Sequence, residues 1–265
     1  MIECVRSSIW SLCLASPLVL GLGCATTGPS PQEQALEQRR EQAEAKYNLG
    51  IDHLDNGRTA LALRELLAAE QLDPNDVWTQ LGLAEAYRRS DRTDDAVRHL
   101  ERAMQLDPKD QNARLNLTGV LIQRGDFEGA ARHAQVLVDD PTFPAPWRGL
   151  TNLGWAQYRL GRTDDAYRNL ELATSYNPQY WPAVLNLGII ENERGHRLEA
   201  LTRFQRVLEL RPGPYAEAEV HYRIAEILIA LGQQEKAVPH LVASAGTEPK
   251  GKWGRKSEEY LKLLR

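Results

Sequence analysis

Cysteine is almost absent from this chain of 265 residues. Its three cysteines, Cys4, Cys13 and Cys24, all lie within the first 24 residues. The rest of the chain therefore offers no disulfide, no thiolate metal ligand and no cysteine nucleophile. It also lacks any run of about 18 apolar residues, which a membrane-spanning helix requires. The formal net charge is −4, so bulk positive charge gives no support for nucleic-acid binding.

Motifs for catalysis are also missing. The sequence contains no HExxH, no GxSxG, no phosphate-binding Walker loop and no GxGxxG. None of its six histidines pairs with another histidine or a carboxylate at metal-ligand spacing on one predicted helix; they are His53, His99, His133, His196, His221 and His240. The pairs Asp94-Asp95 and Asp164-Asp165 lie at predicted helix starts, where acidic side chains complement the helix dipole. We expect no enzyme activity, metal, cofactor or small-molecule substrate.

The first residues differ in kind from the rest. Ser7 to Gly23 carry no charge and are rich in apolar residues, which predicts a secretory signal peptide over residues 1–23. The junction Gly23-Cys24 resembles the lipobox of bacterial lipoproteins, although Gly21 stands where that motif prefers leucine. The resemblance implies that Cys24 is acylated and anchors the protein to the periplasmic face of the bacterial outer membrane. An uncleaved anchor helix and a simple secretory signal are the alternatives.

A repeating unit occupies most of the remaining chain. Pro74 and Pro108 are 34 residues apart, as are Pro178 and Pro212. In six successive units a small residue is followed twelve positions later by alanine: Gly50 and Ala62, Ala84 and Ala96, Thr118 and Ala130, Gly154 and Ala166, Gly188 and Ala200, Ala225 and Ala237. Small residues let two antiparallel helices cross closely. Each unit is therefore predicted to be a helical hairpin, and repeats of this length indicate a solenoid.

Turn residues agree with this prediction. Glycine follows the first helix of five units and is expected to adopt left-handed backbone geometry at Gly57, Gly125, Gly161, Gly195 and Gly232. Thr93 and Thr163 are predicted to cap the second helices of their units. A two-residue insertion near residues 142–146 predicts a loop or kink between the third and fourth units.

These features resemble the tetratricopeptide repeat. The resemblance implies an all-α, right-handed solenoid of six helix-turn-helix repeats over residues 43–251, closed by a capping helix over residues 252–265. Residues 24–42 are expected to form the lipidated cysteine, a tether and a lead-in helix. Repeat arrays need a terminal cap to cover their last apolar face, and Tyr260, Leu261 and Leu264 are predicted to face the array.

Members of this family present a concave groove lined by the first helix of each repeat. Carried onto this sequence, the groove would expose an apolar and aromatic stripe with charged margins. Its predicted binding residues are Leu115, Ile122, Trp155, Tyr158, Arg159, Leu185 and Ile189. Such a stripe fits an amphipathic helix or an extended hydrophobic peptide. The alternative is that these side chains only pack inside the solenoid or against the N-terminal lead-in helix.

A lipoprotein built from six such repeats resembles the pilotin-type lipoproteins of type IV pilus assembly (the PilF, PilW and Tgl group). The resemblance implies binding of an outer-membrane secretin subunit, assisting its localisation and multimerisation. One alternative is a periplasmic adaptor that recruits peptidoglycan-remodelling or other envelope enzymes. Another is a regulatory or substrate-delivery subunit of an envelope enzyme such as a glycan or polysaccharide synthase.

Overall fold

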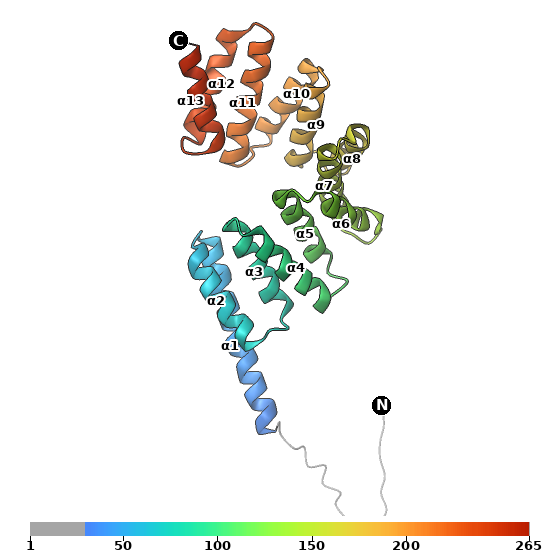
Figure 1. The fold of residues 1–265 in the computed structure, drawn as a ribbon, viewed down its shortest axis with the longest axis vertical. Coiled ribbons are helices and arrows are strands. Elements are labelled where there is room, and N and C mark those ends of the chain that lie inside the picture. Colours follow the sequence, from blue (N-terminus) through green and yellow to red (C-terminus); the bar gives the residue numbers. More distant parts are fainter. Residues whose placement is uncertain (1–29, 265) are drawn as a thin grey trace, which may run out of the picture. The chain divides into compact units, whose positions relative to one another are not determined.

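The computed structural model describes residues 30–264, which form thirteen α-helices and no strand (Figure 1). The helices are α1 (Pro31–Asp55), α2 (Thr59–Leu72), α3 (Val77–Arg89), α4 (Thr93–Leu106), α5 (Gln111–Arg124), α6 (Phe127–Asp139), α7 (Pro146–Arg159), α8 (Thr163–Tyr176), α9 (Trp181–Glu193), α10 (Arg197–Glu209), α11 (Pro214–Ala230), α12 (Gln234–Thr247) and α13 (Lys252–Leu263). The predicted signal peptide and Cys24 lie outside the described residues. The predicted all-α fold is confirmed.

Contacts divide the chain into two compact units, residues 1–38 and residues 39–265. In the first unit, the described residues include the start of α1, where Ser30 and Glu33 form a capping box. The backbone N–H of Ser30 donates to the Glu33 carboxylate at 2.6 Å, and the backbone N–H of Glu33 donates to the Ser30 hydroxyl at 3.3 Å. The helix then continues past residue 42 without a break, so the lead-in and the first repeat share one helix.

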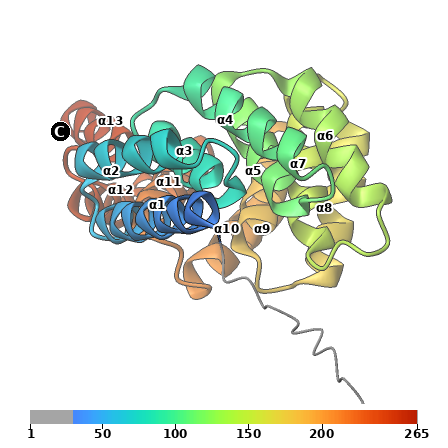
Figure 2. The same cartoon turned by 90° about the horizontal axis from the view of Figure 1, so that it is seen from below.

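In the second unit, consecutive helices pair as hairpins, from α3 with α4 to α11 with α12. From α2 onward each helix packs against the next, and α13 lies beside both α11 and α12 (Figures 1 and 2). Trp253 of α13 is buried, and Tyr260, Leu261 and Leu264 pack against the last apolar cluster. The array ends on the face that the sequence predicts for a cap.

The small residues lie at close helix crossings. A Cβ atom added to Gly188 would be 2.7 Å from the ring of Phe204, and one added to Gly50 would be 2.6 Å from Cγ of Leu66. The alanines twelve positions later are fully buried in all six repeats: Ala62, Ala96, Ala130, Ala166, Ala200 and Ala237. Glycine and alanine at these positions therefore allow the two helix axes of a hairpin to approach.

The turns follow the prediction, whereas the threonine caps do not. All five predicted glycines have positive φ, and Asp91 takes the same conformation (φ 60) in the second repeat. Thr93 and Thr163 are the first residues inside their helices, and the preceding arginines make no side-chain cap. Helix α6 is capped instead by Asp126, whose carboxylate accepts a 2.8 Å hydrogen bond from the backbone N–H of Gly129. This hydrogen bond holds the pKa of Asp126 below its usual value.

Polar side chains nineteen residues apart join the two helices in four hairpins; we call them the hairpin pairs. They are Lys46 with Glu65 (2.7 Å), Gln80 with His99 (2.7 Å), Arg114 with His133 (3.3 Å) and His221 with His240 (2.8 Å). They occupy the same register relative to the small residue of each repeat. In the first three pairs a donor of one side chain faces an acceptor of the other, so the crossing is held by a hydrogen bond as well as by packing.

The insertion between the third and fourth repeats forms a packed loop. It spans the residues between the end of α6 at Asp139 and the start of α7 at Pro146. Phe143 is buried there with Leu115 and Leu137, in a cluster separate from the three larger ones of the described residues. The predicted loop is therefore confirmed, and its aromatic side chain is part of the core.

Candidate functional site

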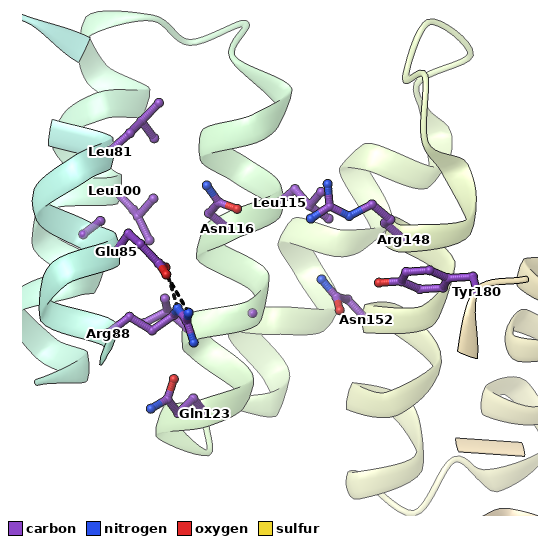
Figure 3. A pocket seen from close by; sticks show the side chains of 13 residues that line it. Leu81, Glu85, Arg88, Leu100, Leu115, Asn116, Gln123, Arg148, Asn152 and Tyr180 are labelled. Carbon is purple, nitrogen blue, oxygen red and sulfur yellow. Dashed lines mark hydrogen bonds and ion pairs between the residues drawn. The ribbon is translucent and has the colours of Figure 1, made fainter. Parts of the chain in front are cut away.

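A pocket of about 390 Å³ opens on helices α3, α5 and α7, the first helices of the second, third and fourth hairpins. Tyr180, from the turn between α8 and α9, completes its wall. Figure 3 shows Arg148, Asn152 and Tyr180 pointing from one side toward Asn116 and the Glu85–Arg88 pair on the other. The remaining lining residues are Leu81, Ala84, Leu100, Leu115, Gly119, Val120 and Gln123.

The position of Asn116 and Asn152 in the pocket follows from their place in the repeat. Asn116 and Asn152 each lie two positions before the small residue of their repeat, so successive first helices present them at equivalent places. The Asn152 amide donates to the hydroxyl of Thr118, which itself donates to the Leu115 carbonyl at 2.6 Å. This chain of bonds orients Asn152, whereas the side chain of Asn116 is exposed and forms no hydrogen bond with the part of the chain that the structure describes.

One carboxylate of α3 binds two arginines, Arg88 of the pocket lining and its neighbour Arg89. Glu85 accepts hydrogen bonds from Arg88 at 2.7 and 2.8 Å and from Arg89 at 2.6 Å. Burial acts to raise the pKa of Glu85, but the hydrogen bonds from the two arginines outweigh it, and the pKa lies below its ordinary value. Glu85 is therefore ionised at neutral pH, and its carboxylate is occupied by hydrogen bonds from Arg88 and Arg89.

Arg148 is the exception among the charged residues of the pocket. Its side chain is exposed and forms no hydrogen bond or ion pair with residues 30–264. Around it lie the side chains of Asn116, Asn152 and Tyr180, which all carry hydrogen-bond donors. Donors around an uncompensated guanidinium suit a carboxylate, because arginine can bind both carboxylate oxygens at once.

Leu115 and Ile122 are the predicted binding residues nearest to this pocket. Leu115 lines the pocket, but it is only 4% exposed because it also packs against Leu137 and Phe143. Ile122 is half-buried and packs against the apolar cluster that runs from α1 to α7.

Trp155, Tyr158 and Arg159 lie together on α7. The rings of Trp155 and Tyr158 are 5.1 Å apart, and the Arg159 guanidinium lies 4.3 Å from the centroid of the Phe127 ring. The Tyr158 hydroxyl donates to Glu193. Burial, followed by that hydrogen bond, raises the pKa of Tyr158 to about 12. All three side chains are thus engaged within the protein while retaining some exposure.

Leu185 and Ile189 are 7% and 6% exposed and belong to the apolar cluster that runs from α9 to α13. A ligand could touch little of either side chain without displacing its neighbours. The binding role of the seven residues stays a prediction, but the structure does not gather them in one pocket. It gathers instead a polar set that sequence reasoning missed: Asn116, Arg148, Asn152 and Tyr180.

Residues 30–264 contain no helix long and apolar enough to cross a membrane. Within the same range, no group of three or more histidine, cysteine or acidic side chains is arranged to hold a metal ion. The candidate lipid-attachment residue Cys24 precedes this range.

Comparison with known proteins identifies the repeat. Sequence models of the tetratricopeptide repeat match residues 33–77, 88–153, 147–171 and 218–250. No sequence of a curated protein matches significantly.

Solved structures share the fold. PilW, described as a widely conserved type IV pilus biogenesis factor, is 20% identical, with a TM-score of 0.68 over 81% of this chain and 97% of that chain. PilF of Pseudomonas aeruginosa is 16% identical, with a TM-score of 0.65 over 84% and 99%. A tetratricopeptide-repeat protein of Thermus thermophilus is 23% identical, with a TM-score of 0.62 over 70% and 99%. The matched repeats and the shared fold make this chain a tetratricopeptide-repeat protein that resembles type IV pilus biogenesis factors.

Proposed function

We propose that this protein is a lipid-anchored pilotin that binds a segment of an outer-membrane secretin subunit and assists its localisation and multimerisation. The proposal assigns membrane attachment to an acylated Cys24 and partner binding to the pocket on α3, α5 and α7. Support comes from the lipobox-like junction at Cys24 and from the fold shared with PilW and PilF. The protein acts by binding, without catalysis.

The binding site is assigned from Arg148, whose guanidinium has no ion-pair partner among residues 30–264. A guanidinium facing donors from three helical layers is best satisfied by an acidic side chain or the terminal carboxylate of a bound segment. Asn116 and Asn152 can then hydrogen-bond the backbone of an extended peptide, because an amide side chain both donates and accepts. The polar groups of the lining favour an extended peptide with polar contacts over the amphipathic helix or extended hydrophobic peptide that the sequence suggests.

The test is capture from solubilised envelopes, read by mass spectrometry, with the wild-type protein, Arg148→Glu and Arg132→Glu. The side chain of Arg132 is also exposed and unpaired with the described residues, but it lies on α6 outside the pocket, so it matches the charge change. We expect secretin with the wild type and with Arg132→Glu, and its loss with Arg148→Glu. Equal capture by both variants would remove the pocket from the proposal.

The anchor is tested separately with Cys24→Ala. Loss of secretin multimers from the outer membrane, with capture in detergent unchanged, is expected if Cys24 supplies only targeting. If hydrolases or synthases dominate the captured proteins and secretin is absent, the pilotin assignment is wrong.

A further inference from the structure

A second pocket, of about 310 Å³, opens between α1 and the start of α3. Two aromatic side chains line it, Tyr47 of α1 and Trp78 of α3. Tyr47 is half-buried, whereas Trp78 is 63% exposed and is the most exposed tryptophan of residues 30–264. An indole beside a pocket, with this much of its surface uncovered, is available for contact with a ligand.

Three carboxylates line the same pocket: Glu44 of α1, and Asp73 and Asp76 of the turn between α2 and α3. None of them forms an ion pair with the part of the chain that the structure describes. Each aspartate accepts a backbone N–H of its own turn through one oxygen, from Asn75 at 3.0 Å and from Thr79 at 2.8 Å. The other oxygen of each aspartate, and both oxygens of Glu44, remain open to a ligand.

The lining as a whole is negative, because Arg40 is its single cationic residue. Burial, followed by the negative charge of Asp76, raises the pKa of Tyr47, so the phenol is neutral at pH 7. Within residues 30–264 no acidic side chains are arranged to hold a metal ion. Aromatic rings attract an organic cation through their quadrupole and carboxylates attract it through their charge, so the lining suits an ammonium or guanidinium group.

This pocket and the one at Arg148 lie along the same row of the solenoid. Glu44, Trp78 and Arg148 each lie six positions before the small residue of their repeat, in the first, second and fourth repeats. Asn48, which also lines the pocket, lies two positions before it, as does Asn116 in the third repeat. The first helices therefore present a negative charge at one end of this row and a positive charge further along it.

We propose that the pocket between α1 and α3, here called the acidic–aromatic pocket, binds a lysine or arginine side chain of a protein segment. Its volume lies at the lower end of the range of about 300–1,000 Å³ for ligand pockets, which suits one side chain. With the basic side chain here and a carboxylate at Arg148, the bound segment would have a fixed direction along the first helices. This direction, unlike the pocket itself, rests on the proposed function.

The test uses single-residue probes, so no secretin is needed. The full chain, in detergent and labelled with 5-fluorotryptophan, is titrated with the Nα-acetyl methylamides of lysine, arginine and norleucine at low ionic strength, where exposed charges are least screened. Norleucine keeps the aliphatic stem and lacks the charge. The fluorine resonance of Trp78 is assigned by its absence from Trp78→Phe. The test variant is Glu44→Gln with Asp73→Asn, which leaves the Asp76 cap in place. Glu41→Gln with Asp55→Asn changes the same charge at exposed positions outside the pocket.

We expect a saturable shift of the Trp78 resonance with the lysine or arginine probe and none with norleucine. The test variant should bind the cationic probe about 5-fold more weakly or worse, and the control variant should bind it as the wild type does. Equal binding of norleucine, equal binding by the test variant, or no saturable shift would overturn the pocket. The outcome does not depend on envelope capture with Arg148→Glu, so failure here and failure of the pilotin assignment are distinguished.

Discussion

Gly154 offers a sharp test of the close helix crossings. An added Cβ atom would lie 2.8 Å from Cγ of Leu170 and 3.1 Å from the backbone oxygen of Ala166. Leu170 is fully buried, and overpacking such a core costs about 1–3 kcal/mol. Gly119, in the middle of α5, would place a Cβ atom within 4 Å of nothing. Alanine gains about 1 kcal/mol of helix propensity at either position, so this gain cancels when the two variants are compared.

We therefore expect Gly119→Ala to be about 1 kcal/mol more stable than the wild type, and Gly154→Ala to be about 1–3 kcal/mol less stable than Gly119→Ala. Urea unfolding followed by circular dichroism measures both variants as shifts of the midpoint at constant m value. Coincident midpoints for the two variants would refute the argument that α7 and α8 cross too closely for a side chain at Gly154.

Two further predictions concern pH and helix capping. Burial lowers the pKa of all four histidines in the hairpin pairs, so the unfolded chain takes up protons first as the pH falls below about 6.5. The free energy of unfolding should therefore fall on acidification from about pH 7 to pH 5.5, and less so when the four are replaced by glutamine; a stability that rises over this range would contradict it. Asp126→Ala should lower the free energy of unfolding by about 1 kcal/mol because it removes a cap, and Thr93→Ala should lower it far less. Equal decreases in the free energy of unfolding for the two variants, measured by urea unfolding, would mean that Thr93 does cap its helix.

Much of the fold could be predicted from the sequence because the decisive contacts recur at a constant spacing. Gly188 and Ala200 illustrate this: their twelve-residue separation alone indicates the crossing that the structure contains. Capping is less predictable, since threonine suits both the cap and the first turn, and a shift of one residue decides between them. Thr163 falls inside its helix, whereas Asp126 falls at the boundary.

The candidate site was harder to predict. Hydrophobic side chains on the first helices, such as Leu185 and Ile189, look alike in sequence whether they face a groove or the next repeat. The two cases differ in how much of the side chain is exposed in the folded protein. That exposure depends on how neighbouring hairpins pack against each other. Arg148 gives no sequence signal of its own, because an unpaired arginine is recognised only when the positions of every nearby carboxylate are known.

The packed insertion has a mechanical consequence. In an array of helical hairpins each repeat contacts only its neighbours. The resistance to bending at each joint, the junction between two successive hairpins, therefore depends on how much surface the two hairpins share there. At the joint between the third and fourth repeats, the loop contributes a small separate cluster around Phe143. We expect this joint to be the least compliant of the junctions between hairpins, because α6 and α7 pack more extensively than the helices at any other such junction and Phe143 fills the loop between them. Leu115 belongs both to that cluster and to the pocket wall, so this rigid junction would hold one wall of the pocket in place while the neighbouring junctions bend.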